Sequence, residues 1–244
     1  MEEKIFQYPN ISETAFSINL LGLNLNVQWY GLSYIAGILL AWFFMAKLVQ
    51  NKDLWFASNS IIERSEVDDL ITYMILGIIV GGRLGYCLFY APMYYFDNPI
   101  RIIYVWEGGM SFHGGFLGVL LSGILFGMRK KISLLSLGDL IAFASPPGLF
   151  FGRIANFING ELWGKPTTST FGIQFTKGKG QFCPSSNEIP CFRHPSQLYE
   201  AFFEGIILML IFYYLVFFSK ALKKPGIIFG SFLLGYGVIR FSIE

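Results

Sequence analysis

The chain has 244 residues, of which 54% are hydrophobic and only 14% are charged, and its mean hydropathy is +0.52. Because a typical soluble domain carries about a quarter charged residues, these figures argue against a disordered chain, a disulfide-rich secreted module and an ordinary soluble enzyme. The net charge of +2, without a long basic tract, gives no indication of a nucleic-acid partner. The class that remains is a polytopic membrane protein.

Several apolar stretches are long enough to cross roughly 30 Å of hydrocarbon, which takes about 20 residues. In chain order they are Tyr30–Lys47, Leu70–Tyr90, Met110–Met128, Leu137–Phe157, Gln197–Phe218 and Ile227–Ile243. Pro146 and Pro147 interrupt the fourth stretch, and proline is tolerated in membrane helices where neighbours satisfy the freed backbone groups, so we predict a kinked span there. The predicted fold is an all-α transmembrane helix bundle of about six spans, forming one integral membrane domain over residues 1–244.

Basic residues alternate between the loops of this bundle. They concentrate at 47–64, 129–131 and 220–224, in the first, third and fifth loops. Since loops rich in Lys and Arg stay in the cytoplasm, we predict that the N-terminus lies outside and that the long polar connection, about residues 158–196, lies on the outer face. The tail begins Met-Glu-Glu and shows no cleavable signal peptide, so the first span is expected to act as its own insertion signal.

The cysteines agree with this topology. Cys183 and Cys191 both fall in the outer connection, where an oxidising compartment would let them pair, whereas Cys87 lies inside a predicted span. We hypothesise a Cys183–Cys191 bridge, and two free thiols are the alternative. No second pair of Cys or His residues is near enough in sequence to suggest a zinc site.

Ionisable side chains inside the predicted spans gather at the outer level. They are Arg83, His113, Arg153, Glu200, Glu204, Arg240 and Glu244, with Tyr30 and Asn156 at the same level. Such residues are costly in a membrane and indicate function by default, although snorkelling and pairing at the interface would explain any single one. Five spans that contribute to one level favour a shared site. Asp139 alone lies near the inner face, where we expect it to cap a helix.

The arginines indicate what such a site binds. A guanidinium presents a planar fork of donors and stays charged, so arginines at headgroup depth suit the phosphate of a phospholipid. Glycines surround His113 in the run WEGGMSFHGG and allow close approach of backbone or ligand. Residues three or four apart share a helix face, as do Arg153 and Asn156, Glu200 and Glu204, and Arg240 and Glu244. The last pair is equally interpreted as a salt bridge that fixes Arg240.

Several motifs resemble the signature of the prolipoprotein diacylglyceryl transferase family. The longest is GRIANFINGELWG at 152–164; the others are WYG at 29–31, GGRLGY around Arg83, WEGGMSFHGG around His113, RHPSQLYEA at 193–201 and GYGVIRFSIE at the end of the sequence. These blocks occur in order from residue 29 to the last residue, so the resemblance covers nearly the whole chain.

The resemblance implies a reaction and its partners. The family transfers the diacylglyceryl group of phosphatidylglycerol to the lipobox cysteine thiol of a prolipoprotein, forming a thioether and releasing glycerol 1-phosphate. It works at the outer face of the bacterial cytoplasmic (inner) membrane, without a metal or an organic cofactor. The expected partners are therefore phosphatidylglycerol, the lipobox peptide of a prolipoprotein and the lipid bilayer, with no nucleic acid.

The resemblance also implies roles for individual residues. We expect His113 to be the base that takes the thiol proton, with His194 as the second candidate. Arg153 and Arg240 are expected to stabilise the departing phosphate. Arg83 is expected to bind substrate, and a structural role is its alternative. The other expected binding positions are Tyr30, Asn156, Glu161, Gly164 and Glu244, and Glu161 could equally orient an arginine or begin the outer segment.

Family members usually add a seventh span after the position that matches Glu244, and this sequence stops there. We therefore expect six spans, in either a shortened sequence or a lineage variant.

Two other classes of function remain as alternatives. A transporter or channel for an anionic solute would predict polar groups near the midplane along a path through the bundle, but the inner halves of the predicted spans are nearly uncharged. A membrane scaffold could dock partners on the connection 158–196, but a scaffold has no need of arginines inside the membrane.

Overall fold

The structure of the chain is a computed structural model that describes residues 6–9, 11–20, 23–176, 183 and 191–243. The described part is mostly helical, as the sequence predicts. By its internal contacts the chain divides into two compact units. The first unit comprises residues 1–44, 141–219 and 228–244, and the second comprises 45–140 and 220–227. Each is described by itself.

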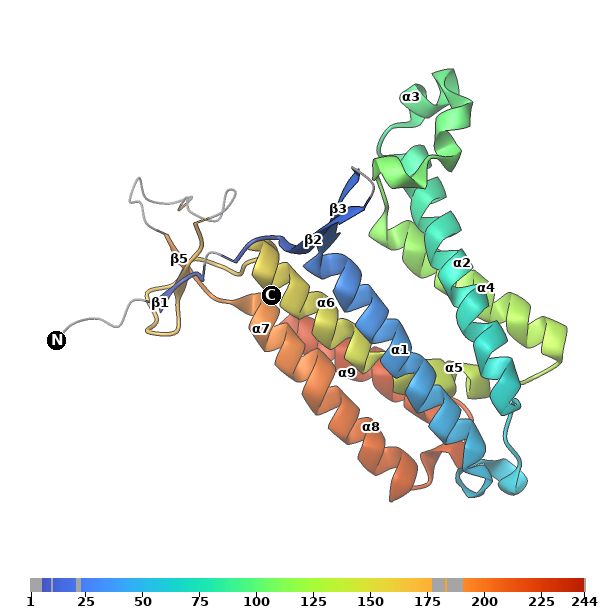
Figure 1. Cartoon of the computed structure of the whole chain (residues 1–244). Helices are drawn as coiled ribbons and strands as arrows, with labels where there is room; N and C mark the ends of the chain where they lie inside the picture. The colour runs from blue at the N-terminus through green and yellow to red at the C-terminus, as the bar shows by residue number, and fades with distance from the viewer. Residues whose placement is uncertain (1–5, 10, 21–22, 177–182, 184–190, 244) are drawn as a thin grey trace. The chain divides into compact units, whose positions relative to one another are not determined.

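Every predicted span is helical over most of its length (Figure 1). Three of them are single helices: α1 (Trp29–Gln50), α2 (Arg64–Phe89) and α4 (Phe112–Lys130). The fifth predicted span is a continuous rod of three parts, α7 (Ser196–Glu200), the π-helical turn η6 (Ala201–Ile207) and α8 (Leu208–Phe217). Each of these four is long and apolar enough to cross a membrane.

The two remaining predicted spans are less regular. The Pro146–Pro147 segment breaks α5 (Leu134–Ala144) from α6 (Pro146–Asn159), and the two helices are bent by 41°, which agrees with the predicted kink. The last helix, α9 (Ile227–Ile243), is apolar but has 17 residues. Length and composition thus allow four spans in the described part of the chain, or five if the bent pair is one span, and the count of six stays a prediction.

The first unit also contains short β-strands that the sequence did not predict. A hairpin of β2 (Thr14–Leu20) and β3 (Leu23–Gln28) leads directly into α1. A second small sheet has the strand order β1-β4-β5 and consists of β1 (Phe6–Gln7), β4 (Ile173–Gln174) and β5 (Phe192–Arg193). The pairing of β1 with β4 joins the N-terminal tail to the connection 158–196.

In the second unit, α2 and α4 lie side by side because glycines line their contact (Figure 1). A Cβ atom on Gly118 would lie 1.9 Å from the carbonyl oxygen of Gly77, and one on Gly114 would lie 2.2 Å from that of Gly81. Backbones can approach this closely only without side chains, which is how small residues promote helix association in membranes.

The second unit also contains the short helical turns η1 (Lys52–Leu54), η2 (Phe56–Ser58) and η7 (Ala221–Lys223). Trp55 anchors them, since it is 1% exposed and its indole nitrogen donates to the carbonyl oxygen of Leu48 at 2.9 Å. Asp139 corrects an expectation. It lies inside α5 rather than at a helix start, and its carboxylate accepts from the backbone nitrogen of Gly226 at 2.7 Å, so it holds the turn before α9.

Candidate functional site

Two partly buried arginines and two buried glutamates form an ion cluster in the first unit. Arg153 of α6 places its Nε atom 3.0 Å from Glu200 Oε2 and 3.1 Å from Glu204 Oε2. Arg240 of α9 donates through Nη1 to Glu200 and lies 4.0 Å from Glu204 Oε1. The two positive and two negative charges balance, which allows a charged cluster to persist between apolar helices.

The backbone places both carboxylates on the same side of the rod. Glu200 is the last residue of α7, and Glu204 lies in the π-helical turn η6. Such turns are rare and frequently occur at functional sites. Gly205 lets η6 approach α6, because a Cβ atom there would lie 2.6 Å from the Cβ atom of Phe150. Glu204 is fully buried and Glu200 is 4% exposed, so both face the protein interior.

Asn156, Tyr30 and Glu161 form a second cluster in the same unit. The side-chain amide of Asn156 donates to the hydroxyl of Tyr30 and to Glu161 Oε1, the latter at 3.1 Å. The end of α6 explains this arrangement: Gly160 has a φ of 69°, a left-handed conformation typical of helix ends. The chain therefore turns back, and the backbone nitrogen of Glu161 donates to the carbonyl oxygen of Asn156 at 3.1 Å.

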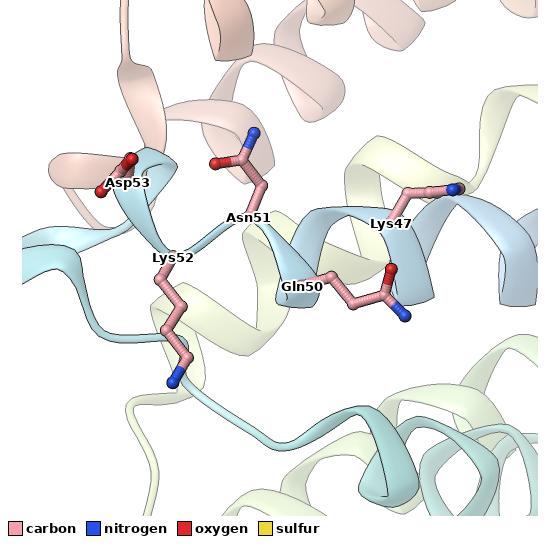
Figure 2. Close-up of a pocket in the computed structure, with 5 residues that line it drawn as sticks. All are labelled: Lys47, Gln50, Asn51, Lys52 and Asp53. Carbon is pink, nitrogen blue, oxygen red and sulfur yellow. The ribbon is translucent and has the colours of Figure 1, made fainter.

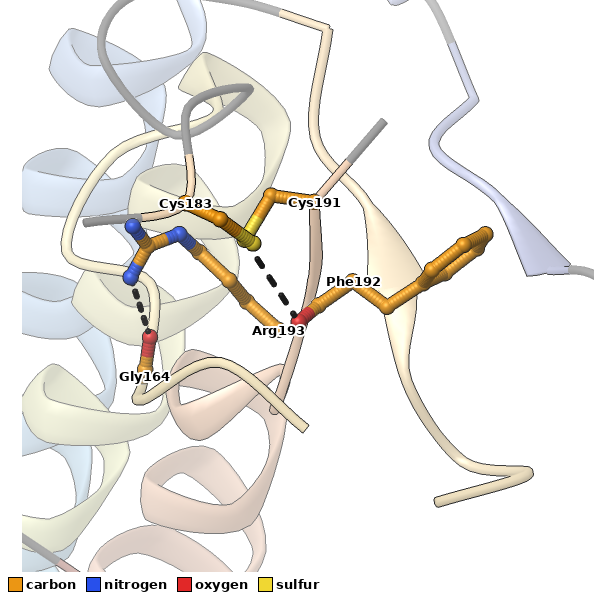
Figure 3. Close-up of a disulfide and its surroundings, with 5 residues drawn as sticks. All are labelled: Gly164, Cys183, Cys191, Phe192 and Arg193. Atoms are coloured by element: carbon orange, nitrogen blue, oxygen red, sulfur yellow. Dashed lines mark hydrogen bonds between the residues drawn. A yellow bond between two sulfur atoms is a disulfide. The ribbon is translucent and has the colours of Figure 1, made fainter. Parts of the chain in front are cut away.

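Gly164 lies where two segments of the connection 158–196 cross. Its backbone nitrogen donates to the carbonyl oxygen of His194 at 2.9 Å, and its carbonyl oxygen accepts from the guanidinium of Arg193 at 3.1 Å (Figure 3). A Cβ atom on Gly164 would lie 2.2 Å from the hydroxyl oxygen of Ser196. Only glycine therefore fits here without displacing the start of α7.

The same connection contains the hypothesised disulfide. Cys183 and Cys191 are bonded, with 5.2 Å between their Cα atoms (Figure 3), which confirms the bridge and rejects the alternative of two free thiols. Arg193 lies beside it with its guanidinium 4.4 Å from the ring centre of Trp163. Burial lowers the pKa of Arg193 from its ordinary value.

His194, the second candidate base, lines an open hollow of about 390 Å³. Its Nδ1 atom lies 3.3 Å from the hydroxyl of Tyr199. The full lining is Lys165, His194, Ser196, Tyr199, Phe203, Ser242 and Ile243. The connection, the start of α7 and the end of α9 thus meet around this imidazole.

His113 and Arg83 belong to the second unit, and their surroundings differ. His113 is exposed in the first turn of α4, beside the ring of Phe112 at 5.7 Å between centroids. Ser111 caps that helix by accepting from the backbone nitrogen of Gly114 at 3.2 Å. The histidine is therefore held on a fixed helix start with its ring accessible.

Arg83 is 3% exposed, and its guanidinium donates hydrogen bonds to backbone carbonyl oxygens. It donates to Arg101 at 2.7 Å, to Ile102 at 2.9 Å and to both Gly108 and Gly109. These carbonyls belong to the segment between α2 and α4, which contains α3 (Pro92–Asp97), η3 (Pro99–Ile103) and η4 (Val105–Glu107). The contacts favour the structural alternative for Arg83.

A further surface hollow lies at the end of α1. It is lined by Lys47, Gln50, Asn51, Lys52 and Asp53, and Figure 2 shows the side chains of Asn51 and Asp53 pointing away from that of Lys52. These five residues include none of the predicted site positions. Among the residues that the structure describes, no group of three or more His, Cys, Asp or Glu side chains is arranged to hold a metal ion.

The structure therefore brings most of the predicted site residues into the first unit. Arg153 and Arg240 share one cluster, and Tyr30, Asn156 and Glu161 share another. Glu244 lies outside the described residues. Sequence reasoning grouped Glu200 and Glu204 with the arginines but gave them no role, and it missed Gln197, which is fully buried and donates to the carbonyl oxygen of Glu161 at 2.5 Å. A polar residue three positions before Glu200 in an otherwise apolar stretch was the available signal.

Several apolar helices of span length, one of which contains the two buried glutamates of a charge-balanced cluster, define a membrane protein with a polar site in its helical part. The family model for prolipoprotein diacylglyceryl transferase matches residues 16–244, and the chain belongs to that family.

Curated relatives named phosphatidylglycerol–prolipoprotein diacylglyceryl transferase match this chain over most of their length. The chain is 48% identical to a phosphatidylglycerol–prolipoprotein diacylglyceryl transferase from Cereibacter sphaeroides over 237 residues, which cover 97% of this chain and 80% of that protein. It is 50% identical to one from Rickettsia felis over 237 residues, 97% of this chain and 84% of that protein. A third, from Ruegeria pomeroyi, is 46% identical over 242 residues, 99% of this chain and 82% of that protein.

Proposed function

We propose that this chain transfers the diacylglyceryl group of phosphatidylglycerol to the lipobox cysteine of a prolipoprotein, the first step of lipoprotein maturation. Membership of the family and the names of its relatives support the reaction. The observation that carries the proposal is the partly buried pair Arg153 and Arg240, because two guanidinium groups among apolar helices suit the phosphate of a lipid.

The reaction requires one bond to form and one to break. The thiolate sulfur of the lipobox cysteine attacks the glyceryl carbon that carries the phosphate oxygen, and a C–S bond forms. The C–O bond breaks, and its electron pair goes to the phosphate oxygen of glycerol 1-phosphate. Arg153 and Arg240 lower the barrier by stabilising this growing negative charge in a site of low dielectric.

The thiol must lose its proton because the thiolate is the nucleophile. We propose His113 as the base, since its imidazole is exposed on a fixed helix start and lies in the family motif WEGGMSFHGG. His194, which belongs to the same unit as the two arginines, is the alternative. The base takes up the proton and then releases it to water or to the departing glycerol 1-phosphate.

The other predicted residues support this chemistry. We propose that Tyr30, Asn156 and Glu161 bind substrate or fix the turn after α6, since they share one hydrogen-bonded cluster. Gly164 keeps the crossing of the outer connection free of a side chain, and Arg83 supports the segment between α2 and α4 rather than touching the lipid. The binding role of Glu244 stays a prediction.

We also propose the finer topology: a single integral membrane domain with six spans in the bacterial inner membrane, the N-terminus outside and the active site toward the outer face. The alternation of basic loops supports this orientation. The disulfide in the connection 158–196 supports an oxidising outer side for that segment.

A transfer assay tests the proposed function. The full-length protein in detergent is mixed with radiolabelled phosphatidylglycerol and a lipobox peptide, and the lipidated peptide is identified by mass spectrometry. We expect a thioether product and stoichiometric glycerol 1-phosphate, and no product from a peptide whose lipobox cysteine is replaced by serine. Absence of lipidated peptide with a well-folded protein would overturn the proposal.

A further inference from the structure

Some buried oxygens in the first unit lack hydrogen-bond donors. Among the side chains that the structure describes, those of Asn159, Gln197, Glu200 and Glu204 each have a buried oxygen that accepts no hydrogen bond. Glu200 Oε2 still has the ion pair with Arg153, whereas Glu204 Oε1 lies 4.0 Å from the nearest guanidinium nitrogen of Arg240. All four atoms are acceptors, so the site is short of donors rather than of acceptors.

Three of these acceptors follow one face of the rod α7–η6. Gln197, Glu200 and Glu204 are spaced by three and four residues, which places their side chains in a row. Gln197 and Glu204 are both fully buried, so this row faces the protein interior. The ion pairs of Glu200 and Glu204 with Arg153 and Arg240 place the two guanidinium groups beside the same row.

The combination points to the chemistry of a ligand. A buried acceptor without a donor costs roughly 1–3 kcal/mol, and a phosphate alone would bring more acceptors and no donor. A headgroup that carries hydroxyls next to its phosphate supplies both: the anion for the arginines and hydroxyl donors for the row of acceptors. A hydrogen bond from a hydroxyl to a carboxylate is among the stronger ones in proteins.

We propose that Glu204 Oε1, assisted by Gln197 Oε1, accepts hydrogen bonds from the glycerol hydroxyls of the lipid headgroup, and so selects lipids with a polyol phosphate headgroup. The proposal rests on the proposed function for the binding of a phospholipid, and it adds the residues that distinguish one headgroup from another. Glu204 is then more than a counter-ion of Arg153, because its second oxygen contacts the substrate.

A comparison of two lipids separates these roles. Phosphatidylglycerol and phosphatidylpropanol have the same phosphodiester charge and the same three-carbon headgroup, but the second lacks hydroxyls. Their affinities for the full-length protein in detergent are measured without any peptide, so no turnover is needed. We expect the wild-type chain to prefer phosphatidylglycerol and Glu204→Gln to lower that preference about 10-fold, since hydrogen bonds to charged groups contribute roughly 1.5–3 kcal/mol.

The ratio of the two affinities decides the result. If Glu204 serves only as a counter-ion, Glu204→Gln weakens the binding of both lipids equally, and the proposal is overturned. The proposal is also overturned if the wild-type chain binds the two lipids with equal affinity. Gln197→Met, which keeps the length of the side chain and removes the acceptor, provides a second test with a smaller expected drop, and an unchanged ratio there removes Gln197 from the proposal. Asp53→Asn, which removes one negative charge at an exposed position just as Glu204→Gln removes one at a buried position, is the matched control and should keep the wild-type ratio.

The outcome is independent of the transfer assay. A chain that prefers phosphatidylglycerol through Glu204 but transfers nothing would contradict the proposed function alone. A chain that transfers the diacylglyceryl group while Glu204→Gln keeps the wild-type ratio would contradict this inference alone.

Discussion

At the scale of single residues, Arg153 has the most demanding position. Its Nε atom contacts both Glu200 and Glu204, which leaves the outer nitrogens of the fork for a phosphate. A lysine keeps the charge but presents a compact ammonium instead of a planar fork that can contact the two carboxylates on one side and a phosphate on the other. We therefore expect Arg153→Lys to lower kcat/KM at least about 10-fold, or about 1.4 kcal/mol of transition-state stabilisation, in the transfer assay, and Arg153→Ala to lower it further.

The control for this prediction is Arg64→Lys. Arg64 forms an exposed i,i+4 ion pair with Asp68 at 3.1 Å, and such surface pairs contribute about 0–1 kcal/mol. Its transfer rate should match that of the wild-type chain. Unchanged kinetics in Arg153→Ala would remove Arg153 from the phosphate-binding role.

The two histidines make a second prediction at this scale. A general base contributes roughly 10²–10⁴-fold to the rate, so we expect His113→Gln to lose transfer by that factor while phosphatidylglycerol still binds. His194→Gln should retain most of the activity, because we propose His113 as the base and the imidazole of His194 contacts the hydroxyl of Tyr199 instead. Both variants are compared by single-turnover rates at equal lipid occupancy, and the reverse pattern would assign the base role to His194.

At the scale of elements, the contact between α2 and α4 predicts a sharp difference between neighbouring glycines. A methyl group on Gly118 would meet the backbone of Gly77, whereas the nearest atom to a Cβ on Gly115 lies 3.8 Å away. We expect Gly118→Ala to destabilise the chain by about 1–3 kcal/mol, the usual cost of overpacking, and Gly115→Ala to have little effect.

Thermal unfolding in detergent, followed by the accessibility of Cys87, measures this difference. Cys87 is a buried free thiol on α2, so its exposure reports unfolding of the second unit around that helix. Equal melting temperatures for the two alanine variants would show that α2 and α4 do not pack through these glycines.

The same elements show how far the sequence predicts the structure. Hydropathy is a local property, and it found the bounds of α9 and the break at Pro146. The strands β1, β4 and β5 have two residues each and exist only through pairing between distant segments, so no local pattern marks them. The π-helical turn η6 was likewise invisible, because its sequence is as apolar as that of an ordinary helix.

The candidate site was predictable only where a local pattern in the sequence marks a residue. Charged residues in apolar stretches are conspicuous, so Arg153 and Arg240 could be singled out, and their level in the membrane stays a prediction. The ion pairs of Arg153 with Glu200 and Glu204 could not be inferred, because they depend on how η6 packs against α6. Arg83 illustrates the limit: the sequence offers it as a phosphate ligand, but backbone carbonyls occupy its guanidinium.

At the scale of the whole molecule, charge has two separate uses. The basic residues at 47–64, 129–131 and 220–224 lie in the end turns of the apolar helices or in the turns between them, and they set the predicted orientation. The charges of the cluster formed by Arg153, Arg240, Glu200 and Glu204 balance one another, so this cluster adds nothing to that orientation. The orientation and the site are therefore independent, and each requires its own test.

Thiol labelling of single-cysteine variants tests the orientation. In a chain with Cys183→Ser and Cys191→Ser, a cysteine is introduced at the exposed Thr168 of the outer connection or at the exposed Lys224 between α8 and α9. A membrane-impermeant maleimide added to intact cells with a permeable outer membrane should label Thr168→Cys at once. Lys224→Cys should react only after the inner membrane is opened with detergent, because the positive-inside rule places that loop in the cytoplasm.

The parent without either new cysteine keeps only the buried Cys87 and gives the background. Labelling of Lys224→Cys in intact cells, with Thr168→Cys protected, would reverse the topology and place the connection 158–196, with its disulfide, on the reducing side of the membrane.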